Sequence, residues 1–391
     1  MITFEEAFGI VALSAIELET ERTELAEAAG RILAEDVFSD MDMPPFNKSA
    51  VDGYACRRED LEGELTVIEV IPAGKIPEKA VGKGQCSKLM TGGMVPEGAD
   101  TVVMIEDIET TGENTVRFKG ENTSANIAVK AEDIRKGALV LEKGIRLTPP
   151  HIAVLASVGC ARPLVSRKPR VAVISTGDEL VEPSQVPGIA RIRNSNAYQL
   201  LAQARNAGCD AAYYGIASDN EEHTYNKITA AQLQSDIILL TGGVSTGDFD
   251  FVPAIIEKAG FDIKFRTMAV QPGKPTIFAV RGKQFLFGLP GNPVSAFVQF
   301  HLLGGMLIRK MTGCTDEERI LRIPMGVDYR RKKASRKSFI PVKVTTAATV
   351  LPVEYHGSAH IHSFVHADGI ISIEIGQTEL LKGSLVDVRL L

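Results

Sequence analysis

The N-terminal third of the chain changes from a helical to an extended hydrophobic pattern. Apolar residues recur at helical spacing over 4–16 and again over 23–37, which predicts two helices. Between about residues 45 and 135, short runs rich in β-branched residues, such as 64–71 and 100–107, are separated by Gly and Pro. Such punctuation is typical of short strands, so this stretch predicts a small, mostly β module.

The pattern then returns to helix before it becomes an alternation of strands and helices. Residues 147–159 predict a helix, and Pro149 and Pro150 suit its first turn. From about residue 168, continuous apolar strands alternate with amphipathic helices, which indicates a largely parallel sheet covered on both faces. The predicted strands are 170–176, 210–218, 236–243, 275–280 and 284–291, and the predicted helices are 194–208, 250–260 and 293–303.

From about residue 321 the chain reverts to short strands, among them 338–346, 369–376 and 384–391. We expect these strands to form a separate small β-barrel or sandwich. The predicted fold class is therefore multidomain α/β with a central doubly wound, mostly parallel sheet. The expected domains are an N-terminal elongated helical and extended domain (1–44 and 136–167), an inserted mostly β module (45–135), the α/β domain (168–320) and a C-terminal β-barrel-like domain (321–391).

Composition narrows the function classes. The 391 residues are 45% hydrophobic and 24% charged with a formal net charge of -6, an ordinary globular balance that disfavours a broad nucleic-acid surface. The five cysteines show no C-x-x-C spacing, which fits reduced thiols in the cytosol. The N-terminus has no basic leader, and no apolar run approaches the roughly 20 residues that span a bilayer. We expect a cytoplasmic protein with neither nucleic-acid nor membrane partners.

Ligands of open α/β sheets bind beyond the carboxyl ends of the strands, and glycine-rich loops follow two predicted strands there. The loop 241–248 lets backbone N–H groups approach an anion, and the segment 290–295 precedes a helix whose free N–H groups favour a phosphate or oxyanion. Asn292 and Ser295 can add side-chain donors. Each loop alone could equally be a simple turn, but two loops on one sheet edge favour an anion site.

Carboxylates follow three different strands at the same predicted edge. Glu179, Asp219 and Asp250 are the candidates, with Asp178 and Asp248 beside them. Acidic groups beside a phosphate site usually need a divalent cation between them, and oxygen ligands suit Mg²⁺. The alternative is a set of helix caps and turn formers, a role that Asp commonly fills. Neither a Walker loop nor G-x-G-x-x-G is present.

Six ordered motifs, including the turn-rich segments of the β module, resemble one known family. They are 44–55 (PPFNKSAVDGYA), 91–100 (TGGMVPEGAD), 175–180 (STGDEL), 241–250 (TGGVSTGDFD), 272–275 (PGKP) and 288–297 (GLPGNPVSAF). In this order and at these distances they are similar to the molybdopterin molybdenumtransferases, the MoeA and gephyrin E-domain family. The resemblance runs along essentially the whole chain.

The resemblance implies an elongated homodimer of four-domain subunits whose sheet domain is of the molybdopterin-binding type. It implies a reaction of adenylyl-molybdopterin with molybdate, dependent on Mg²⁺, that releases AMP and molybdenum cofactor. A molybdopterin adenylyltransferase is the implied protein partner, since that enzyme makes the substrate. The resemblance also implies that each cleft joins the sheet domain of one subunit to the β module of the other.

Residue by residue, the resemblance assigns three groups. Catalytic roles fall on Asp52, Thr91, Asp133, Glu179, Asp219 and Asp250, of which Glu179, Asp219 and Asp250 would hold the metal. Substrate binding falls on Gly242, Gly243, Ser245, Gly247 and Asp248, and on Pro290, Gly291, Asn292, Pro293 and Ser295. A molybdate pocket would be lined by Lys274, Pro275, Arg336 and Ser358.

Two positions depart from the family pattern. Gln271 stands where the family often has a basic residue, and Asn47-Lys48 stands where an Asp-Asn pair is common. We therefore expect normal chemistry with an altered affinity for molybdate.

Three alternative functions remain open: an enzyme similar to molybdopterin adenylyltransferase, a tungstate-specific homologue and a gephyrin-like scaffold. A metal site at His356, His360, His362 and His366 is disfavoured, because histidines on a surface hairpin are usually solvated; the basic run 330–333 is interpreted as a solvated linker face.

Overall fold

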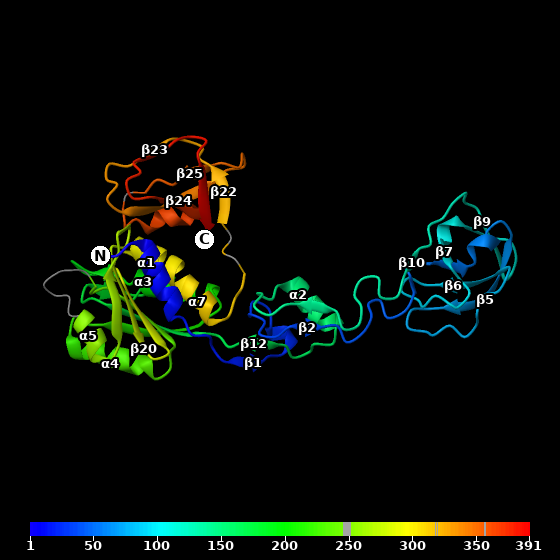
Figure 1. Cartoon of the computed structure of the whole chain (residues 1–391), viewed down its shortest axis with the longest axis horizontal. Coiled ribbons are helices and arrows are strands. Elements are labelled where there is room, and N and C mark those ends of the chain that lie inside the picture. Colours follow the sequence, from blue (N-terminus) through cyan, green and yellow to red (C-terminus); the bar gives the residue numbers. More distant parts are fainter. Residues whose placement is uncertain (245–251, 317, 319, 356) are drawn as a thin grey trace.

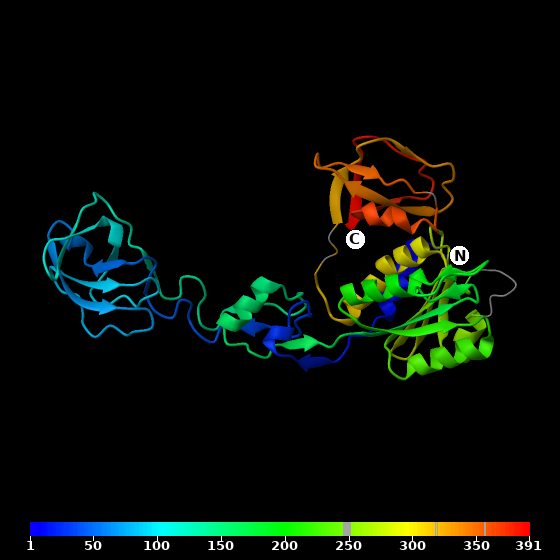
Figure 2. The ribbon, with the colours of Figure 1, turned by 180° about the vertical axis from the view of Figure 1, so that it is seen from behind.

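The computed structural model describes residues 1–244, 252–316, 318, 320–355 and 357–391. The molecule is elongated, with a small β module at one end and the α/β domain at the other (Figure 1). The C-terminal β domain lies against the α/β domain, as the view from behind also shows (Figure 2). Among the described residues, no helix is long and apolar enough to span a bilayer.

The first helix packs on the α/β domain although it begins the chain. Helix α1 (Phe4–Ser14) starts with a capping box, in which Thr3 Oγ1 accepts from the Glu6 N–H at 3.1 Å and Glu6 Oε2 accepts from the Thr3 N–H at 2.7 Å. Phe4, Ala7 and Val11 are buried in the core of the α/β domain. The N-terminal domain itself follows, built on the strand pairs β1 (Thr20–Arg22) with β12 (Leu164–Ser166) and β2 (Val37–Phe38) with β11 (Leu139–Leu141), and on α2 (Pro149–Ser157).

The second predicted helix, over 23–37, is wrong. Only the short 3-10 turn η1 (Leu25–Glu27) forms there. Gly30 has φ of +81°, outside the helical range, and the chain beyond it pairs in extended form, Ile32 with Arg146 and Leu33 with Val165. Pairing with distant segments therefore holds this part of the chain extended, and its apolar residues are buried in that conformation. This tertiary pairing overrides the helical spacing of the apolar residues.

The inserted module is mostly β, as its sequence indicates. Its six-stranded sheet has the order β7 (Thr101–Met104), β4 (Gly53–Cys56), β6 (Gln85–Leu89), β5 (Glu64–Ile71), β9 (Thr115–Phe118) and β8 (Ile108–Thr110). The pair β3 (Lys48–Ser49) with β10 (Ile127–Ala128) adjoins it. The entering and leaving chains meet at a bridge between Met43 and Ile134, so the module hangs from one narrow neck.

The α/β domain contains the predicted parallel sheet with an antiparallel edge. The sheet order is β16 (Asp210–Ala217), β13 (Arg170–Thr176), β17 (Ile237–Thr241), β21 (Gln284–Leu289), β20 (Pro275–Arg281) and β18 (Asp262–Thr267). The first four strands are parallel, and β20 runs antiparallel to both of its neighbours. Separate apolar cores lie on the two faces of the sheet, which is the doubly wound arrangement.

Helices cover both faces. One core includes α3 (Ser195–Asn206) and α6 (Pro293–Gln299), and the other includes α4 (Glu221–Gln232) and α5 (Val252–Lys258). Helix α4 is absent from the sequence-based prediction because only Thr224, Ile228 and Ala231 of it are buried, which leaves a weak apolar stripe. Helix α6 continues through a π-helical turn, η4 (Phe300–Gly304), into α7 (Gly305–Met311).

One strand of the C-terminal sheet comes from the α/β domain. Its sheet has the order β19 (Val270–Gln271), β24 (Lys337–Val344), β26 (Gly369–Ile373), β28 (Leu385–Leu390) and β22 (Ile320–Pro324), and β25 (Val350–Pro352) also pairs with β24. Strand β19 pairs in parallel with β24 and so joins the two domains through backbone hydrogen bonds. The pair β23 (Tyr329–Arg330) with β27 (Glu379–Leu380) and the 3-10 helix η5 (Ile361–His366) complete the domain.

Candidate functional site

A cavity of about 760 Å³ lies at the carboxyl ends of β13, β17 and β21. It brings together the predicted site residues Glu179, Asp219, Gly242, Gly243, Pro275, Pro290, Gly291, Asn292 and Pro293. A hollow of about 770 Å³ lies at the opposite end of the sheet, near the starts of β13 and β16, but Arg167 and Arg170 there are ion-paired with Asp236. The carboxyl-end cavity is therefore the better candidate site.

Close packing forces glycine at the floor of this cavity. Gly242 has φ of +95°, and a Cβ on it would lie 2.5 Å from the carbonyl oxygen of Thr176. A Cβ on Gly291 would lie 3.8 Å from the Gly242 Cα, so the two loops touch. The backbone of both loops is thereby brought to the cavity without side-chain obstruction, as an anion site requires.

Asn196 ties the two loops together and is a site residue that the sequence did not reveal. Its side chain is 8% exposed, lines the cavity, and donates from Nδ2 to Thr241 Oγ1 and to the Gly291 carbonyl, both at 2.8 Å. Nearby, Asn194 caps α3 by accepting from the Ala197 N–H at 3.3 Å. A faint signal was present in the sequence, because a second Asn stands in the first turn of α3 where one is enough for the cap.

Two of the three predicted metal-binding carboxylates line the cavity. The Glu179 carboxylate lies over Gly177, where an added Cβ would be 2.3 Å from Oε2. Asp219 and Asp178 exchange bonds, since each carboxylate accepts from the other's backbone N–H at 3.2 Å. Asp250 lies outside the described residues, as do Ser245, Gly247 and Asp248. Over the part of the chain that is described, no three His, Cys, Asp or Glu side chains gather as a metal site.

The C-terminal domain forms one wall of the cavity. Ala359, Ile361 and His362 line it, and Ser358 accepts at Oγ from Asn292 Nδ2 at 2.9 Å. The Ser358 carbonyl also accepts from the Val294 N–H at 3.0 Å. One of the helix N–H groups expected to face an anion is therefore already engaged. Ser295 is buried in the first turn of α6 and does not line the cavity.

The predicted molybdate residues border the cavity on another side. Pro275 lines it, whereas Lys274 is exposed and does not. Arg336 donates from Nη1 to the Val270 carbonyl at 3.3 Å, beside β19, and is also outside the lining. The loop that carries Lys274 is held from below, because Gln299 Nε2 donates to the Pro272 carbonyl at 2.8 Å and Thr276 Oγ1 donates to the Gly273 carbonyl at 2.9 Å.

Three predicted catalytic residues lie far from the cavity within one chain. Asp52 belongs to the inserted module at the other end of the molecule (Figure 1), where Oδ1 accepts from the Thr91 N–H at 2.6 Å and from Thr91 Oγ1 at 2.8 Å. The backbone bond and the hydroxyl bond from Thr91 lower the pKa of Asp52. Asp133 lies at the neck, where its N–H donates to the Met43 carbonyl.

The histidine segment and the basic run both differ from expectation. His362 and His366 lie on the 3-10 helix η5 and not on a strand, and His362 lines the cavity; His356 lies outside the described residues. The basic run 330–333 is not uniformly solvated. Arg331 is half-buried and donates to the carbonyls of Glu374, Gln377 and Arg336, which fastens the C-terminal domain together.

Comparison with known proteins covers the whole chain. The MoeA N-terminal region (domain I and II) matches residues 2–159, the probable molybdopterin binding domain matches 172–310, and the MoeA C-terminal region (domain IV) matches 324–391. A molybdopterin molybdenumtransferase of Staphylococcus epidermidis is 35% identical over 400 residues, which span 100% of this chain and 95% of that protein. The chain belongs to the molybdopterin molybdenumtransferase family.

Further members of the family are also similar to this chain over nearly its whole length. A molybdopterin molybdenumtransferase of Staphylococcus aureus is 34% identical over 378 residues, 94% of this chain and 90% of that protein. The crystal structure of a molybdopterin biosynthesis MoeA protein of Pyrococcus horikoshii matches with a TM-score of 0.84 at 30% identity, covering 100% of both chains. A second structure under the same name and genus matches at 0.82 and 32% identity, over 100% of this chain and 99% of that one. The predicted fold class and family are thus confirmed.

Proposed function

We propose that this protein inserts molybdenum from molybdate into molybdopterin, with adenylyl-molybdopterin as the substrate and AMP as the released product. One observation carries the proposal: Glu179, Asp219, the Gly242 turn and the Pro290–Pro293 loop of a family member meet in one cavity. The cavity volume of about 760 Å³ suits a nucleotide-linked ligand of ordinary size. Full-length relatives carry the name of this transferase, which supports the same reaction.

The acidic side of the cavity would hold Mg²⁺. Glu179 and Asp219 line one wall, and hard carboxylate oxygens are the ligands that Mg²⁺ prefers. Asp250 is proposed as the third ligand. When bound, the ion would neutralise charge that develops on the phosphoanhydride. The chain's own residues orient the substrate, because Asn196 fixes the loop at Gly291 that faces it.

Molybdate would bind at the cavity rim, between the exposed Lys274 and the half-buried Pro275, Arg336 and Ser358. Two cationic side chains can neutralise a small dianion, while Ser358 adds a hydroxyl donor. Gln271 is exposed at the end of β19 and directly precedes the Pro272–Lys274 loop. We expect Gln271→Lys to tighten molybdate binding several-fold by adding a positive charge there. Unchanged affinity in a titration by calorimetry would reject Gln271 as the cause of weakened oxyanion binding.

The functional unit is proposed to be a homodimer. Asp52 and Thr91 are held together on the module, but the module and the cavity lie at opposite ends of one chain (Figure 1). A second subunit can bring these residues, and Asp133 at the neck, to the cavity. We further propose a cytoplasmic site of action and a molybdopterin adenylyltransferase as the partner that supplies the substrate.

The deciding experiment supplies adenylyl-molybdopterin, Mg²⁺ and molybdate to the purified protein. AMP release and reconstitution of an apo-molybdoenzyme are then followed together. We expect molybdate-dependent AMP release that Asp219→Ala and Asp250→Ala each abolish. A folded protein that releases no AMP with molybdate would contradict the proposal. AMP release with tungstate but not with molybdate would identify a tungstate-specific enzyme. If both Ala variants restored molybdoenzyme activity in cells that lack this protein as well as the wild type does, a scaffold would be favoured instead.

A further inference from the structure

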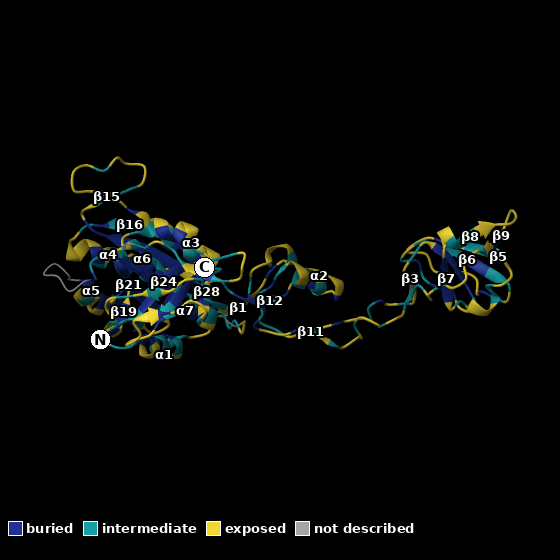
Figure 3. Ribbon diagram, turned by 90° about the horizontal axis from the view of Figure 1, so that it is seen from above, coloured by how far each residue is buried: buried dark blue, intermediate teal, exposed yellow. Residues whose placement is uncertain are grey.

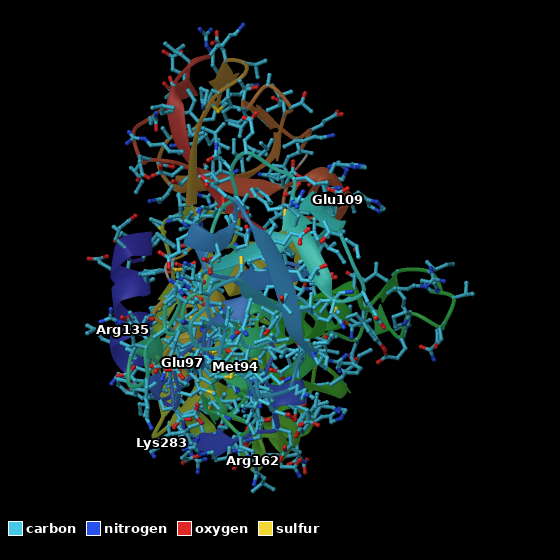
Figure 4. The ribbon with its side chains drawn as sticks, turned by 90° about the vertical axis from the view of Figure 1, so that its right-hand side faces the viewer. Met94, Glu97, Glu109, Arg135, Arg162 and Lys283 are labelled. Carbon is cyan, nitrogen blue, oxygen red and sulfur yellow. The ribbon has the colours of Figure 1, made fainter. Side chains whose placement is uncertain are left out.

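An arm, residues 182–191, projects from the rim of the cavity into solvent. It leaves the paired strands β14 (Leu180–Val181) and β15 (Ile192–Arg193), and it is the exposed loop beyond β15 in Figure 3. Viewed along the long axis of the molecule, the arm extends sideways from the α/β domain (Figure 4). Its tip is apolar, with Val186 86% exposed and Ile189 102% exposed. Two apolar side chains gathered at the tip of a projecting element offer a small apolar surface that a partner can cover.

The root of the arm is held rigidly. Glu182 Oε1 accepts from the Tyr213 hydroxyl at 2.7 Å, and Oε2 accepts from the Tyr198 hydroxyl at 3.0 Å. Arg193 Nε donates to the Gln185 carbonyl at 3.0 Å across the base. The arm begins three residues after Glu179, which lines the cavity. A partner seated on the arm is therefore held at a fixed place over the cavity rim.

A complementary surface lies beside Asp52 on the inserted module. Met104 is 37% exposed and Ile105 41% exposed, and the Ile105 N–H donates to the Asp52 carbonyl at 3.1 Å. The next two residues, Glu106 and Asp107, are acidic. This apolar pair with an acidic flank matches the arm, whose apolar tip is followed by the exposed Arg191 and Arg193. Charge complementarity of this kind selects partners and fixes their register.

We infer that the arm of one subunit docks on Met104–Asp107 of a second copy of this chain. The inference rests on the proposed homodimer and names the contact that completes its cleft. Docking places the Asp52–Thr91 pair above the cavity that carries Glu179 and Asp219. Within one chain the two surfaces lie at opposite ends of the molecule, so the contact must be intermolecular (Figure 1).

Cysteine pairing tests the contact without using activity. In a Cys160→Ser, Cys314→Ser background, which removes the partly exposed native thiols, Ile189→Cys and Ile105→Cys are placed on differently tagged chains that are mixed and oxidised. We expect a disulfide-linked species that carries both tags, because bridging needs Cα atoms within about 7 Å. The matched control joins Ile105→Cys to Leu233→Cys, which is 83% exposed at the end of α4. Linkage no greater than in this control overturns the inference, whether the protein is dimeric or monomeric.

A charge swap gives a second measurement. Arg191→Glu and Glu106→Arg should each raise the dimer dissociation constant about tenfold in sedimentation, and the double variant should return to within about threefold of the native value. Additive weakening in the double variant overturns the contact. AMP release is measured in parallel on the wild-type protein. Disulfide linkage above the control without AMP release by the wild type rejects the proposed reaction and keeps the contact, while AMP release by the wild type without such linkage does the reverse.

Discussion

Asp236, just before β17, is a carboxylate buried to 7% exposure at the junction with the N-terminal domain. It accepts from both terminal nitrogens of Arg167, at 2.7 and 2.9 Å, and from the Arg170 N–H at 2.8 Å. Arg167 Nε also donates to Glu19 Oε2 at 3.0 Å, so the cluster links the two domains. Burial alone would raise the pKa of Asp236, but the hydrogen bonds from Arg167 and Arg170 outweigh it and lower that pKa.

Asp236→Asn should therefore destabilise the fold in a pH-dependent way. A lowered folded-state pKa stabilises the protein above the unfolded value of about 4, and that stabilisation is lost as the pH falls through the folded value. We expect a loss of about 2–4 kcal/mol at pH 7, because the half-buried Arg167 loses its bidentate charged partner and keeps only the exposed Glu19. Thermal unfolding followed by circular dichroism should show a difference in melting temperature between variant and wild type that narrows below about pH 4. A difference that does not change with pH would contradict the lowered pKa of Asp236.

Asn196→Ala should impair catalysis more than stability. The substitution removes both bonds that hold Thr241 and Gly291 in place, and small displacements at a reacting centre cost up to about 100-fold in rate. We expect kcat/KM for AMP release to fall at least about tenfold. The matched control is Asn206→Ala at the exposed end of the same helix, which should leave kcat/KM unchanged. Equal effects of the two variants would remove Asn196 from the site.

Some residues of the candidate site could be predicted from the sequence, and others could not, for a physical reason. Glu179, Asp219 and Gly242 follow predicted strands directly, so the topology of a parallel sheet places them at one edge. Asn196 and His362 reach the same cavity from a helix and from another domain. Their positions depend on helix docking and domain packing, which periodicity does not encode.

At the scale of elements, the helix that begins at Pro293 contains a π-helical turn at its centre. The turn, Phe300–Gly304, separates α6 from α7 and lets Phe300 fold back over Gly304. A Cβ on Gly304 would lie 2.3 Å from Phe300 Cδ2, whereas one on Gly305 meets nothing within 4 Å. Because α6 carries the cavity loop at one end and Gln299 at the other, this turn sets how both loops are held.

These two neighbouring glycines make a matched pair of variants. Gly304→Ala should destabilise the protein by about 1–3 kcal/mol through overpacking against the buried Phe300. Gly305→Ala should be neutral or stabilise by up to about 1 kcal/mol, since alanine favours helix. Urea denaturation of both proteins measures the difference. Equal stability of the two variants would show that Phe300 moves aside at little cost.

Other elements show where sequence periodicity is reliable. The continuous apolar runs of β13 and β17 predicted buried strands correctly, because both faces of a parallel strand are covered. The segment 23–37 has helical spacing, yet Gly30 and pairing with distant strands hold it extended. Helix α4 shows the converse case, since few of its side chains are buried. Long-range pairing and shallow burial are the properties that local patterns miss.

At the scale of the whole molecule, the separation of module and cavity predicts complementation between inactive subunits. If each cleft takes Asp52 from one chain and Asp219 from the other, Asp52→Ala and Asp219→Ala homodimers should both be inactive. Random mixing should restore about a quarter of the wild-type sites, because half of the dimers are mixed and each has one intact cleft. AMP release after co-refolding measures this, and recovery near zero would place both residues in one chain's cleft.

The narrow neck of the inserted module has a consequence for how such chains can be rearranged. Met43 pairs with Ile134, and the Ala131 N–H donates to the Pro44 carbonyl at 3.0 Å, so the chain departs and returns at a single point. Grafting between relatives need match only this seam, since no strand of the α/β domain is cut. The module is in effect a cassette: its surface can be exchanged or excised as a unit while the remaining scaffold keeps its own cores.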